Sequence, residues 1–435
     1  MTAKGWIILL SVLALLMIIE KIVAIRRDVN TYTFSDFLVN LSCGILERVF
    51  AFFWYYIFYV AAVWVFENVA LWSIPFDATD LSNPMTWVTW FGGLLVADFL
   101  AYWHHRLSHE INFLWAAHIV HHQSEDINIS TVFRVSFFAV INRSLFFIWM
   151  PVFGFPPALA LSTILFVGAF QFVTHSRLIG KLGFLEKIFS TPSNHRVHHA
   201  RNEKYIDHNY GHVFMFWDHM FGTYTPEEEE PDYGITTGFT SENAYNSVFF
   251  YWKDLYKRAK LASKFKDKIK LFFAKPVWTP DDVGYLPNQF EVDENGNRLL
   301  HVRPITKSFG LYMLLNNLLT LVFFVSLFGI VEDPKKTVFS DLIENKHLLV
   351  LVLTILFSVL AHGRLLDNMK GAKILDTVRL LVIAVGIPFA YSNTAVSAWI
   401  GPAIWAFTAV MILWLWINPK THLATPGARL NTQTA

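Results

Sequence analysis

Cysteine and charged side chains are scarce in this sequence of 435 residues. It has one cysteine, Cys43, so no internal disulfide can form and no CxxC pair is available for a zinc or iron–sulfur site. Charged residues make up 16% of the chain, against about 25% in ordinary soluble domains. Hydrophobic residues make up 54%. This composition favours a membrane protein and excludes a disordered one, and any metal site must use nitrogen and oxygen ligands.

A strong net charge is also lacking. The formal value of +1 at pH 7 gives no indication of a nucleic-acid partner.

What the chain does contain is a series of long apolar runs, from which we predict about nine membrane spans. We interpret the first run as a retained helix because no small-residue cleavage site follows it. The predicted spans lie at 5–25, 47–70, 87–103, 136–152, 158–175, 309–331, 347–362, 378–394 and 397–417.

Basic residues in the connections predict the orientation of these spans. The connections at 71–86 and 153–157 contain no Lys or Arg, whereas those near 26–48 and 364–379 are basic. Because basic loops stay in the cytoplasm, the N-terminus is predicted outside. Every histidine cluster then falls on the cytoplasmic face, of the endoplasmic reticulum in a eukaryote or of the inner membrane in a bacterium. The predicted fold is all-α and polytopic, with a cytoplasmic helical cap that carries a histidine-rich di-metal site.

We divide the chain into four regions. Residues 1–86 and 309–420 are predicted transmembrane helices, 87–225 the catalytic domain and 226–308 a cytoplasmic or interfacial segment. Within the last of these, YWKDLYKRAKLASKFKDKIKLFFAK mixes basic and aromatic residues in the manner of a helix on an anionic membrane surface. The same basic surface could instead dock an electron-donor protein. The acidic run Glu227–Glu230 is predicted to be a solvated loop.

Histidines are concentrated in one part of the chain. Thirteen of the seventeen lie between residues 104 and 219, and HHRLSHEINFLWAAHIVHH (104–122) holds six of them. HxxHH occurs twice, at His118 and at His195. On a helix these offsets place imidazoles on one side, one turn apart. Two such faces opposed to each other could surround two metal ions.

The number and type of these ligands indicate which metal they would hold. Imidazole nitrogen suits iron, copper, nickel and zinc. A catalytic zinc ion needs three protein ligands, so eight or nine histidines suggest a pair of metals. Chemistry with O₂ on an unactivated C–H bond requires iron or copper. Iron is favoured, because the chain has one cysteine and its methionines are not grouped with the histidines.

Several motifs together resemble a known family. DFLAYWHHRLSH, WAAHIVHH and STPSNHRVHH resemble the histidine signature of the fatty acid hydroxylase/sterol desaturase superfamily. LGFLEKIFSTPSNHRVHHARN and FWDHMFGTY are most similar to its alkylglycerol monooxygenase branch. The resemblance implies an integral-membrane enzyme that binds two iron ions and uses O₂.

The resemblance also implies a set of metal ligands. His104 should face away from the site, about 100° around the helix from His105. Asn194 stands where the branch usually has a histidine, and it could ligate iron through its oxygen or hold a water. Gln171 should contact a ligand. The implied ligands are His105, His109, His118, His121, His122, His175, His195, His198 and His199.

Carboxylates near the ligands are further candidates, because a ligating histidine usually donates its other N–H to a carboxylate or carbonyl. Asp98 is the foremost, since it falls within an apolar span, and with Glu110 and Asn194 it completes the predicted catalytic set. His208, His212 and His219 lie outside the HxxHH pattern and are predicted at the surface or beside a ligand. The remaining acidic candidates are Glu125, Asp126, Asp207 and Asp218.

The predicted reaction is hydroxylation of a lipid C–H bond with O₂. If the lipid is an alkylglycerol, hydroxylation beside the ether oxygen gives a hemiacetal, which collapses to an aldehyde and a glycerol derivative. The resemblance implies tetrahydrobiopterin or another external reductant, or an electron-donor protein. A sterol, carotenoid or fatty-acyl hydroxylase or desaturase remains an alternative with the same site. A histidine-rich metal transporter is a further alternative, although no internal repeat supports it.

Overall fold

The computed structural model describes residues 3–29, 31–284, 305–330, 346–392 and 397–418. Residues 285–304, within the predicted interfacial segment, lie outside this range. The regular secondary structure of the described residues is helical, apart from two isolated β-bridges, Phe189–Phe214 and Ala200–Tyr233. The chain divides into two compact units: residues 1–49, 239–247 and 289–435 form one, and residues 50–238 and 248–288 form the other. We call them the C-terminal unit and the histidine unit.

The histidine unit combines long apolar helices with several short ones. α2 belongs to this unit from residue 50 onward, and α10 from residue 248 onward. The helices are α2 (Phe34–Asn68), α3 (Pro84–Glu110), α4 (Asn112–His122), η1 (Ile129–Phe133), α5 (Phe137–Phe147), α6 (Trp149–Val152), α7 (Pro157–Thr174), η2 (Gly183–Lys187), α8 (Pro192–His199), α9 (Phe216–Phe221), α10 (Ala244–Leu261) and α11 (Phe265–Phe273).

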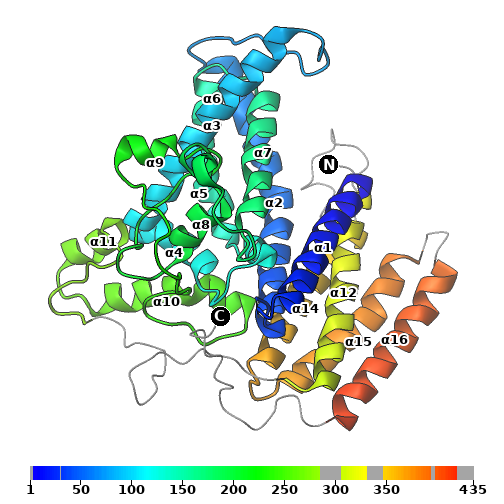
Figure 1. Ribbon diagram of the computed structural model, residues 1–435. Helices are drawn as coiled ribbons and strands as arrows, with labels where there is room; N and C mark the ends of the chain where they lie inside the picture. The colour runs from blue at the N-terminus through cyan, green and yellow to red at the C-terminus, as the bar shows by residue number, and fades with distance from the viewer. Residues whose placement is uncertain (1–2, 30, 285–304, 331–345, 393–396, 419–435) are drawn as a thin grey trace. The chain divides into compact units, whose positions relative to one another are not determined.

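Packing between α3 and α7 forms the frame of the histidine unit. The two helices lie side by side (Figure 1). They approach closely at Gly93, where an added Cβ would lie 3.3 Å from the side chain of Leu159. Lower along the pair, Ala97 and Ala101 of α3 pack with Ile164 of α7 in a buried apolar cluster. The small residues on α3 allow this close packing, which fixes the end of α3 that carries the first histidines.

The C-terminal unit is a bundle of apolar helices. It contains α1 (Ala3–Arg26), α12 (Lys307–Ile330), α14 (Lys346–Leu366), α15 (Ala372–Ala390) and α16 (Ser397–Ile417), with α14 packed against α12 and α15, and α15 against α16. The carboxylate of Asp367, just beyond α14, accepts hydrogen bonds from Ser241 Oγ and from the backbone N–H of Glu242. This contact ties the segment that leads into α10 to the end of α14.

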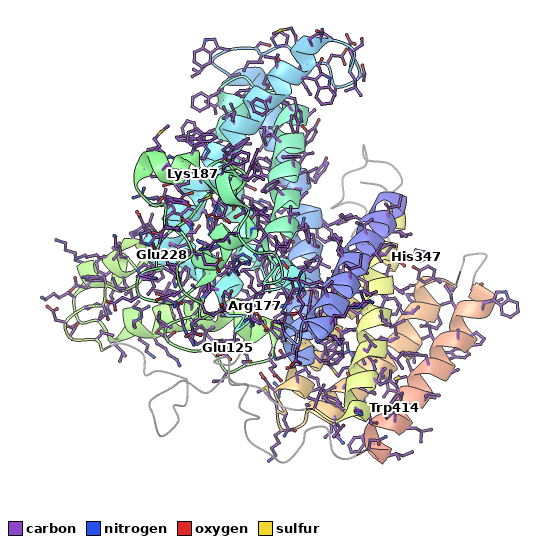
Figure 2. The ribbon with its side chains drawn as sticks, viewed as in Figure 1. Glu125, Arg177, Lys187, Glu228, His347 and Trp414 are labelled. Atoms are coloured by element: carbon purple, nitrogen blue, oxygen red, sulfur yellow. The ribbon has the colours of Figure 1, made fainter. Side chains whose placement is uncertain are left out.

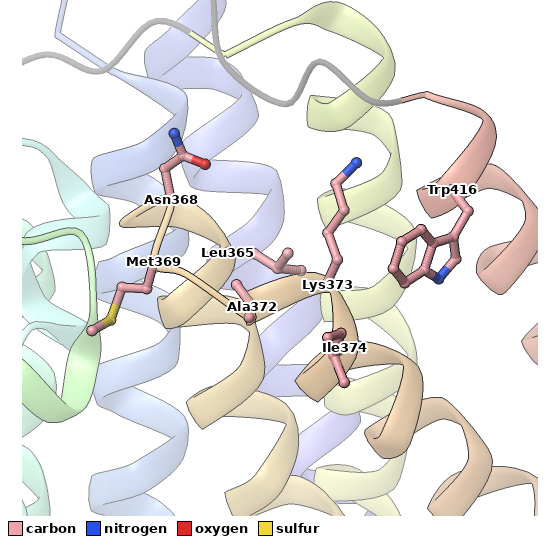
Figure 3. A pocket seen from close by; sticks show the side chains of 8 residues that line it. Leu365, Asn368, Met369, Ala372, Lys373, Ile374 and Trp416 are labelled. Carbon is pink, nitrogen blue, oxygen red and sulfur yellow. The ribbon is translucent and has the colours of Figure 1, made fainter.

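A pocket of about 290 Å³ lies at one end of this bundle (Figure 3). Leu365, Met369 and Ile374 supply apolar walls, and Trp416 faces them from α16. Lys373 donates to the carbonyl oxygens of Leu415 and Asn418, so its ammonium caps the C-terminal end of α16. The pocket contains none of the residues that the sequence predicts to be functional.

Within the described ranges, seven helices are long and apolar enough to cross a membrane. Seven of the predicted spans coincide with them, which agrees with a polytopic membrane protein. The other two differ. The run at 136–152 is broken into α5 and α6 and is too short to span as one helix. The run at 378–394 belongs to α15, which carries Lys373, Asp376 and Arg379 and does not meet the same criterion. The seven spans are in α1, α2, α3, α7, α12, α14 and α16.

The predicted amphipathic segment 251–275 also differs in detail, because it forms two helices, α10 and α11, with a break between Leu261 and Phe265. On α11, Leu271 is fully buried, whereas Phe265, Ile269 and Phe273 are exposed on the other side. The lysines of this helix flank the exposed apolar stripe. The pattern is that of a helix at a membrane interface.

Candidate metal centre

The first five histidines come from two consecutive helices. Asn83 caps α3, where its side chain accepts from the N–H of Met85, and Pro84 occupies the first helical position. α3 ends at Glu110, Ile111 adopts an extended conformation, and α4 begins at the next residue. The single extended residue folds the chain back. His105 and His109 on α3 therefore face the histidines of α4, and the Nε2 atoms of His105 and His118 lie 3.1 Å apart.

The other four come from a helix end and a short helix. His175 directly follows the last residue of α7. α8 starts with Thr191, whose side chain accepts from the N–H of Asn194, followed by Pro192. All eight residues of α8 are buried. Because α8 is only two turns long, tertiary contacts rather than helix propensity must hold it.

Arg196 supplies the strongest of these contacts. Its guanidinium makes a bidentate ion pair with Glu227, at 2.6 and 2.7 Å, and also donates to the carbonyl oxygens of Ser176 and Ile179. It thereby joins α8 to the segment that follows His175. Both members of the pair are largely buried, so the prediction of a solvated loop was wrong for Glu227. Nothing in the local sequence pattern distinguishes this glutamate from its neighbours.

The nine predicted ligands converge into two groups. In each group, one potential ligand atom per residue lies within 4.8 Å of all the others. α4 and α8 each contribute to both groups, because successive histidines on a helix point in different directions. The first group is His105, His109, His118, His122 and His198, and the second is His121, His175, His195 and His199.

Hydrogen bonds fix which nitrogen of several rings points inward. Nδ1 of His105 lies 2.9 Å from the carbonyl oxygen of Tyr210, Nδ1 of His175 lies 2.8 Å from that of Gln171, and Nδ1 of His198 lies 3.0 Å from that of His208. A carbonyl can only accept, so each Nδ1 carries the proton and each Nε2 presents a lone pair. Backbone carbonyls therefore accept the second N–H of these three ligands.

These inward lone pairs meet one another. In the second group, Nε2 of His175 lies 2.9 Å from Nε2 of His195 and 3.1 Å from Nε2 of His121. In the first group, the buried Nε2 atoms of His109 and His198 have no hydrogen-bond partner in the described part of the chain. Converging, unsatisfied nitrogen lone pairs are unfavourable alone and suit a shared cation. The residues present therefore fit a pair of metal ions.

The protonation state of the histidines on α4 and α8 also agrees with metal binding. Burial lowers the pKa of every imidazole on α4 and α8 well below its ordinary value. Burial likewise lowers the pKa of His175 to about 4. Neighbouring imidazoles add to the effect on α4 and α8, because two positive charges at this distance repel. The rings are neutral near pH 7, as metal ligation requires.

Asp98, the foremost predicted carboxylate, anchors a loop. It is fully buried and accepts hydrogen bonds from the N–H groups of Val213 and Phe214 and from the indole of Trp217. Asp218 acts similarly, because it accepts from the N–H groups of Tyr210 and Gly211. Both carboxylates hold the loop whose Tyr210 carbonyl orients His105.

The remaining acidic candidates contact other groups. Glu110 pairs with Arg106 at 2.9 Å, and Asp126 pairs at 3.2 Å with Arg177, labelled in Figure 2 together with Glu125. Asp207 lies 3.4 Å from Nδ1 of His109 and is the member of this set beside a predicted ligand.

Asn194 is buried next to the first HRVHH histidine. Its side-chain NH₂ donates to the carbonyl oxygens of Glu186 and Phe189, at 2.9 and 3.2 Å. Its side-chain oxygen is buried and has no hydrogen-bond partner among the described residues. The amide nitrogen therefore supports the preceding turn, and the oxygen is left available to a water or an ion.

The other described histidines between residues 104 and 219 lie outside both groups. His104 packs edge-on against Phe146, 5.2 Å between ring centroids, in agreement with its prediction to face elsewhere. His219 is exposed and its ring packs against Tyr224 in a tilted arrangement, 4.1 Å between centroids. The ring of His212 is 4.8 Å from that of His105, and its carbonyl accepts from Gln171.

Two aromatic residues at the cluster were missed from the sequence. The ring of Tyr210 is 5.3 Å from His109 and 5.7 Å from His105, and the ring of Trp115 is 4.9 Å from His109. Tyr210 belongs to the YIDHNYG motif and Trp115 to WAAHIVHH. Neither residue type stands out in a chain that is 17% aromatic.

The fold and site define a polytopic membrane protein with a buried histidine centre that can hold two metal ions. Residues 90–223, which include all nine histidines of the two groups, match the fatty acid hydroxylase family. The chain belongs to this family of lipid-modifying membrane oxygenases.

Individual relatives extend the similarity beyond this region. The chain is 30% identical to a human protein named alkylglycerol monooxygenase, over 84% of this chain and 79% of that one. It is 30% identical to the Xenopus tropicalis protein of the same name, over 88% and 82% respectively. It is also 33% identical to the ornithine lipid hydroxylase OlsE of Rhizobium tropici, over 33% of this chain and 44% of that one. No solved structure matches the chain.

Proposed function

We propose that this protein is a di-iron monooxygenase that hydroxylates a C–H bond of an ether lipid with O₂. The observation that carries the proposal is the division of nine histidines, seven of them buried, into two groups of potential ligands, five and four in number. The similarity to proteins named alkylglycerol monooxygenase supports the substrate class.

The ligand set favours iron over the alternatives. The described clusters offer imidazole nitrogen without thiolate, and nine ligands exceed the need of one catalytic zinc. When bound, two ferrous ions would supply the electrons and the Lewis acidity for O₂ reduction and C–H oxidation.

The chain's own residues then hold and orient this centre. The carbonyls of Tyr210, Gln171 and His208 fix the tautomers of their histidines, and Asp207 does the same for His109. Asp98 acts through the 213–217 loop as a positioning residue. The buried oxygen of Asn194 has the chemistry to hold a water beside the second group.

For an alkylglycerol substrate, hydroxylation of the carbon beside the ether oxygen gives a hemiacetal. This collapses to an aldehyde and a glycerol derivative. Electrons come from an external reductant, tetrahydrobiopterin or a donor protein, since the chain has no cysteine set for an iron–sulfur cluster. We place the reaction at the cytoplasmic face, of the endoplasmic reticulum or the bacterial inner membrane, because the basic connection near 26–48 between α1 and α2 puts the histidine end of α3 on that side.

Lipid mass spectrometry tests the proposal. Cells that express the chain are fed a labelled alkylglycerol, and the aldehyde and its acid are quantified beside the iron content of the purified protein. His118→Ala should abolish both product and iron, whereas His219→Ala, which changes an exposed histidine outside the groups, should leave them intact. If the ether lipids stay unchanged while the purified protein holds two irons, the proposed substrate is wrong and the assignment as an oxygenase still stands.

The similarity to an ornithine lipid hydroxylase favours a second candidate, hydroxylation of an acyl chain without cleavage. A sterol or carotenoid hydroxylase or desaturase would use the same site. The same experiment separates these cases, because they yield a lipid that gains an oxygen or loses two hydrogens and keeps its carbon chain.

A further inference from the structure

A chain of oxidisable aromatic rings leads away from the histidine cluster. Tyr210 lies against three histidines of the first group, with ring centroids 5.3 to 5.8 Å apart. Tyr102 lies edge-on to Tyr210 at 6.1 Å, and Trp103 lies edge-on to Tyr102 at 5.7 Å. Both tyrosines are buried, whereas Trp103 is half-buried. The rings are close to van der Waals contact, so each is a short step for electron transfer.

The hydrogen bonds of Tyr102 have a defined direction. Arg106 can only donate, so the Tyr102 oxygen accepts a hydrogen bond from its guanidinium, at 3.3 Å. Thr223 donates its own hydrogen to Asp218, at 2.7 Å. The Tyr102 hydroxyl therefore donates to Thr223 Oγ1, 2.9 Å away. A proton that leaves Tyr102 has a hydrogen-bonded path through Thr223 to the Asp218 carboxylate.

Asp218 can accept that proton. It is fully buried, and burial raises the pKa of its carboxyl to about 6. Oxidation of a buried tyrosine requires a nearby proton acceptor, because the phenol radical cation is a very strong acid. The described structure gives this arrangement to Tyr102.

We propose that Tyr102 is a redox-active residue that carries electrons, one at a time, from an external one-electron reductant to the histidine cluster. This inference rests on the proposed oxygenase function. Tyr102 loses an electron through the Tyr210 ring to the oxidised centre, and its proton moves by way of Thr223 to Asp218. The reductant returns an electron through Trp103, and the proton moves back. The net change is one electron from reductant to centre and no net proton transfer.

Arg106 determines which ring holds the unpaired electron. Its guanidinium lies over the Trp103 ring, 5.4 Å from the centroid. A cation at that position destabilises a positively charged indole radical, whereas the tyrosine becomes a neutral radical once its proton has moved. The oxidised state therefore rests on Tyr102, and Trp103 is a transient step.

A tethered photosensitiser tests the proposal without the metal chemistry. Met220, next to Phe221 against Trp103, is 65% exposed, and the native Cys43 is buried. A ruthenium polypyridyl complex on Met220→Cys in the full-length protein can therefore be photo-oxidised beside this chain of rings. We expect a tyrosyl radical by transient absorption and electron paramagnetic resonance. The signal should be lost in Tyr102→Phe and persist in Tyr233→Phe, a buried tyrosine whose hydroxyl has no partner among the described residues.

Thr223→Val keeps both tyrosines and interrupts the proton path, so it tests the proposal even if Tyr102→Phe does not accumulate. Radical formation should slow, and its solvent deuterium isotope effect should disappear. A radical that survives Tyr102→Phe, or an unchanged isotope effect in Thr223→Val, would overturn the inference. Because the sensitiser replaces the metal centre as oxidant, these outcomes are separate from the iron and lipid measurements above.

Discussion

The two units bury polar side chains among apolar helices in opposite ways. In the C-terminal unit, Asp376 accepts from Tyr312 and from Arg379, which also donates to the side-chain oxygen of Asn316. There, opposite charges and complementary dipoles largely satisfy one another. In the histidine unit, nitrogens of one kind face each other, with Nε2 atoms 2.9 to 3.2 Å apart. A network that satisfies itself stabilises a fold, whereas a group of like acceptors is complete only with a cation.

The largest test of this contrast removes one ligand. His195→Ala takes away a buried imidazole at the centre of the second group. We expect metal affinity and activity to fall by more than about 100-fold, because even the loss of a residue that supports a ligand costs 10–100-fold. Iron content and product formation measure the effect. Full activity after this change would show that His195 is not a ligand.

The next largest effect is expected on the stability of the C-terminal unit. Asp376→Asn leaves Arg379 buried without its counter-ion, at a cost of about 3–5 kcal/mol in the free energy of unfolding. Metal content per folded molecule should not change. Replacing the pair with apolar residues, Asp376→Leu with Arg379→Met, should recover most of the stability, as measured by detergent-induced unfolding. A single substitution without effect would show that the ion pair contributes nothing.

A smaller effect on metal affinity is expected from a change at Asp98, whose carboxylate holds the loop at residues 213–214. Asp98→Asn replaces one of two acceptor oxygens with an amide donor, which meets the N–H of Val213 or Phe214. Metal affinity should fall by about 10–100-fold, with the histidines still in place. Competition with a chelator measures it. Asp281→Asn, at an exposed site, is the control and should behave like the unmodified protein.

The smallest effect is a pH dependence of the metal-free protein. The pKa of His175 is about 4 in the fold, against 6.5 for the free side chain. The unfolded chain therefore binds more protons between these values, and stability falls as pH drops from 6.5 toward 4. Each such histidine contributes up to about 1.4 kcal/mol per pH unit. Unfolding of metal-free protein at several pH values tests this, with His175→Gln expected to flatten the slope.

Sequence patterns predicted the elements that depend on local or periodic signals. The HxxHH spacing identified which faces of α4 and α8 carry the histidines, and apolar runs located the seven long helices. The partners of Asp98 could not be predicted, because they are backbone groups of residues 213 and 214, more than a hundred positions away. The break between α5 and α6 was missed for another reason. Apolar composition alone does not reveal where a helix stops. The other predicted span that failed, 378–394, belongs to α15, which carries the charged residues Lys373, Asp376 and Arg379.

The sharing of α4 and α8 between both histidine groups bears on how the centre assembles. His118 and His122 belong to one group and His121 to the other, and His198 is likewise separated from His195 and His199. An ion that binds in one group fixes the rotation of both helices and so orders the ligands of its neighbour before the second ion arrives. Uptake should therefore be cooperative, and protein with a single ion should remain a minor species throughout a metal titration.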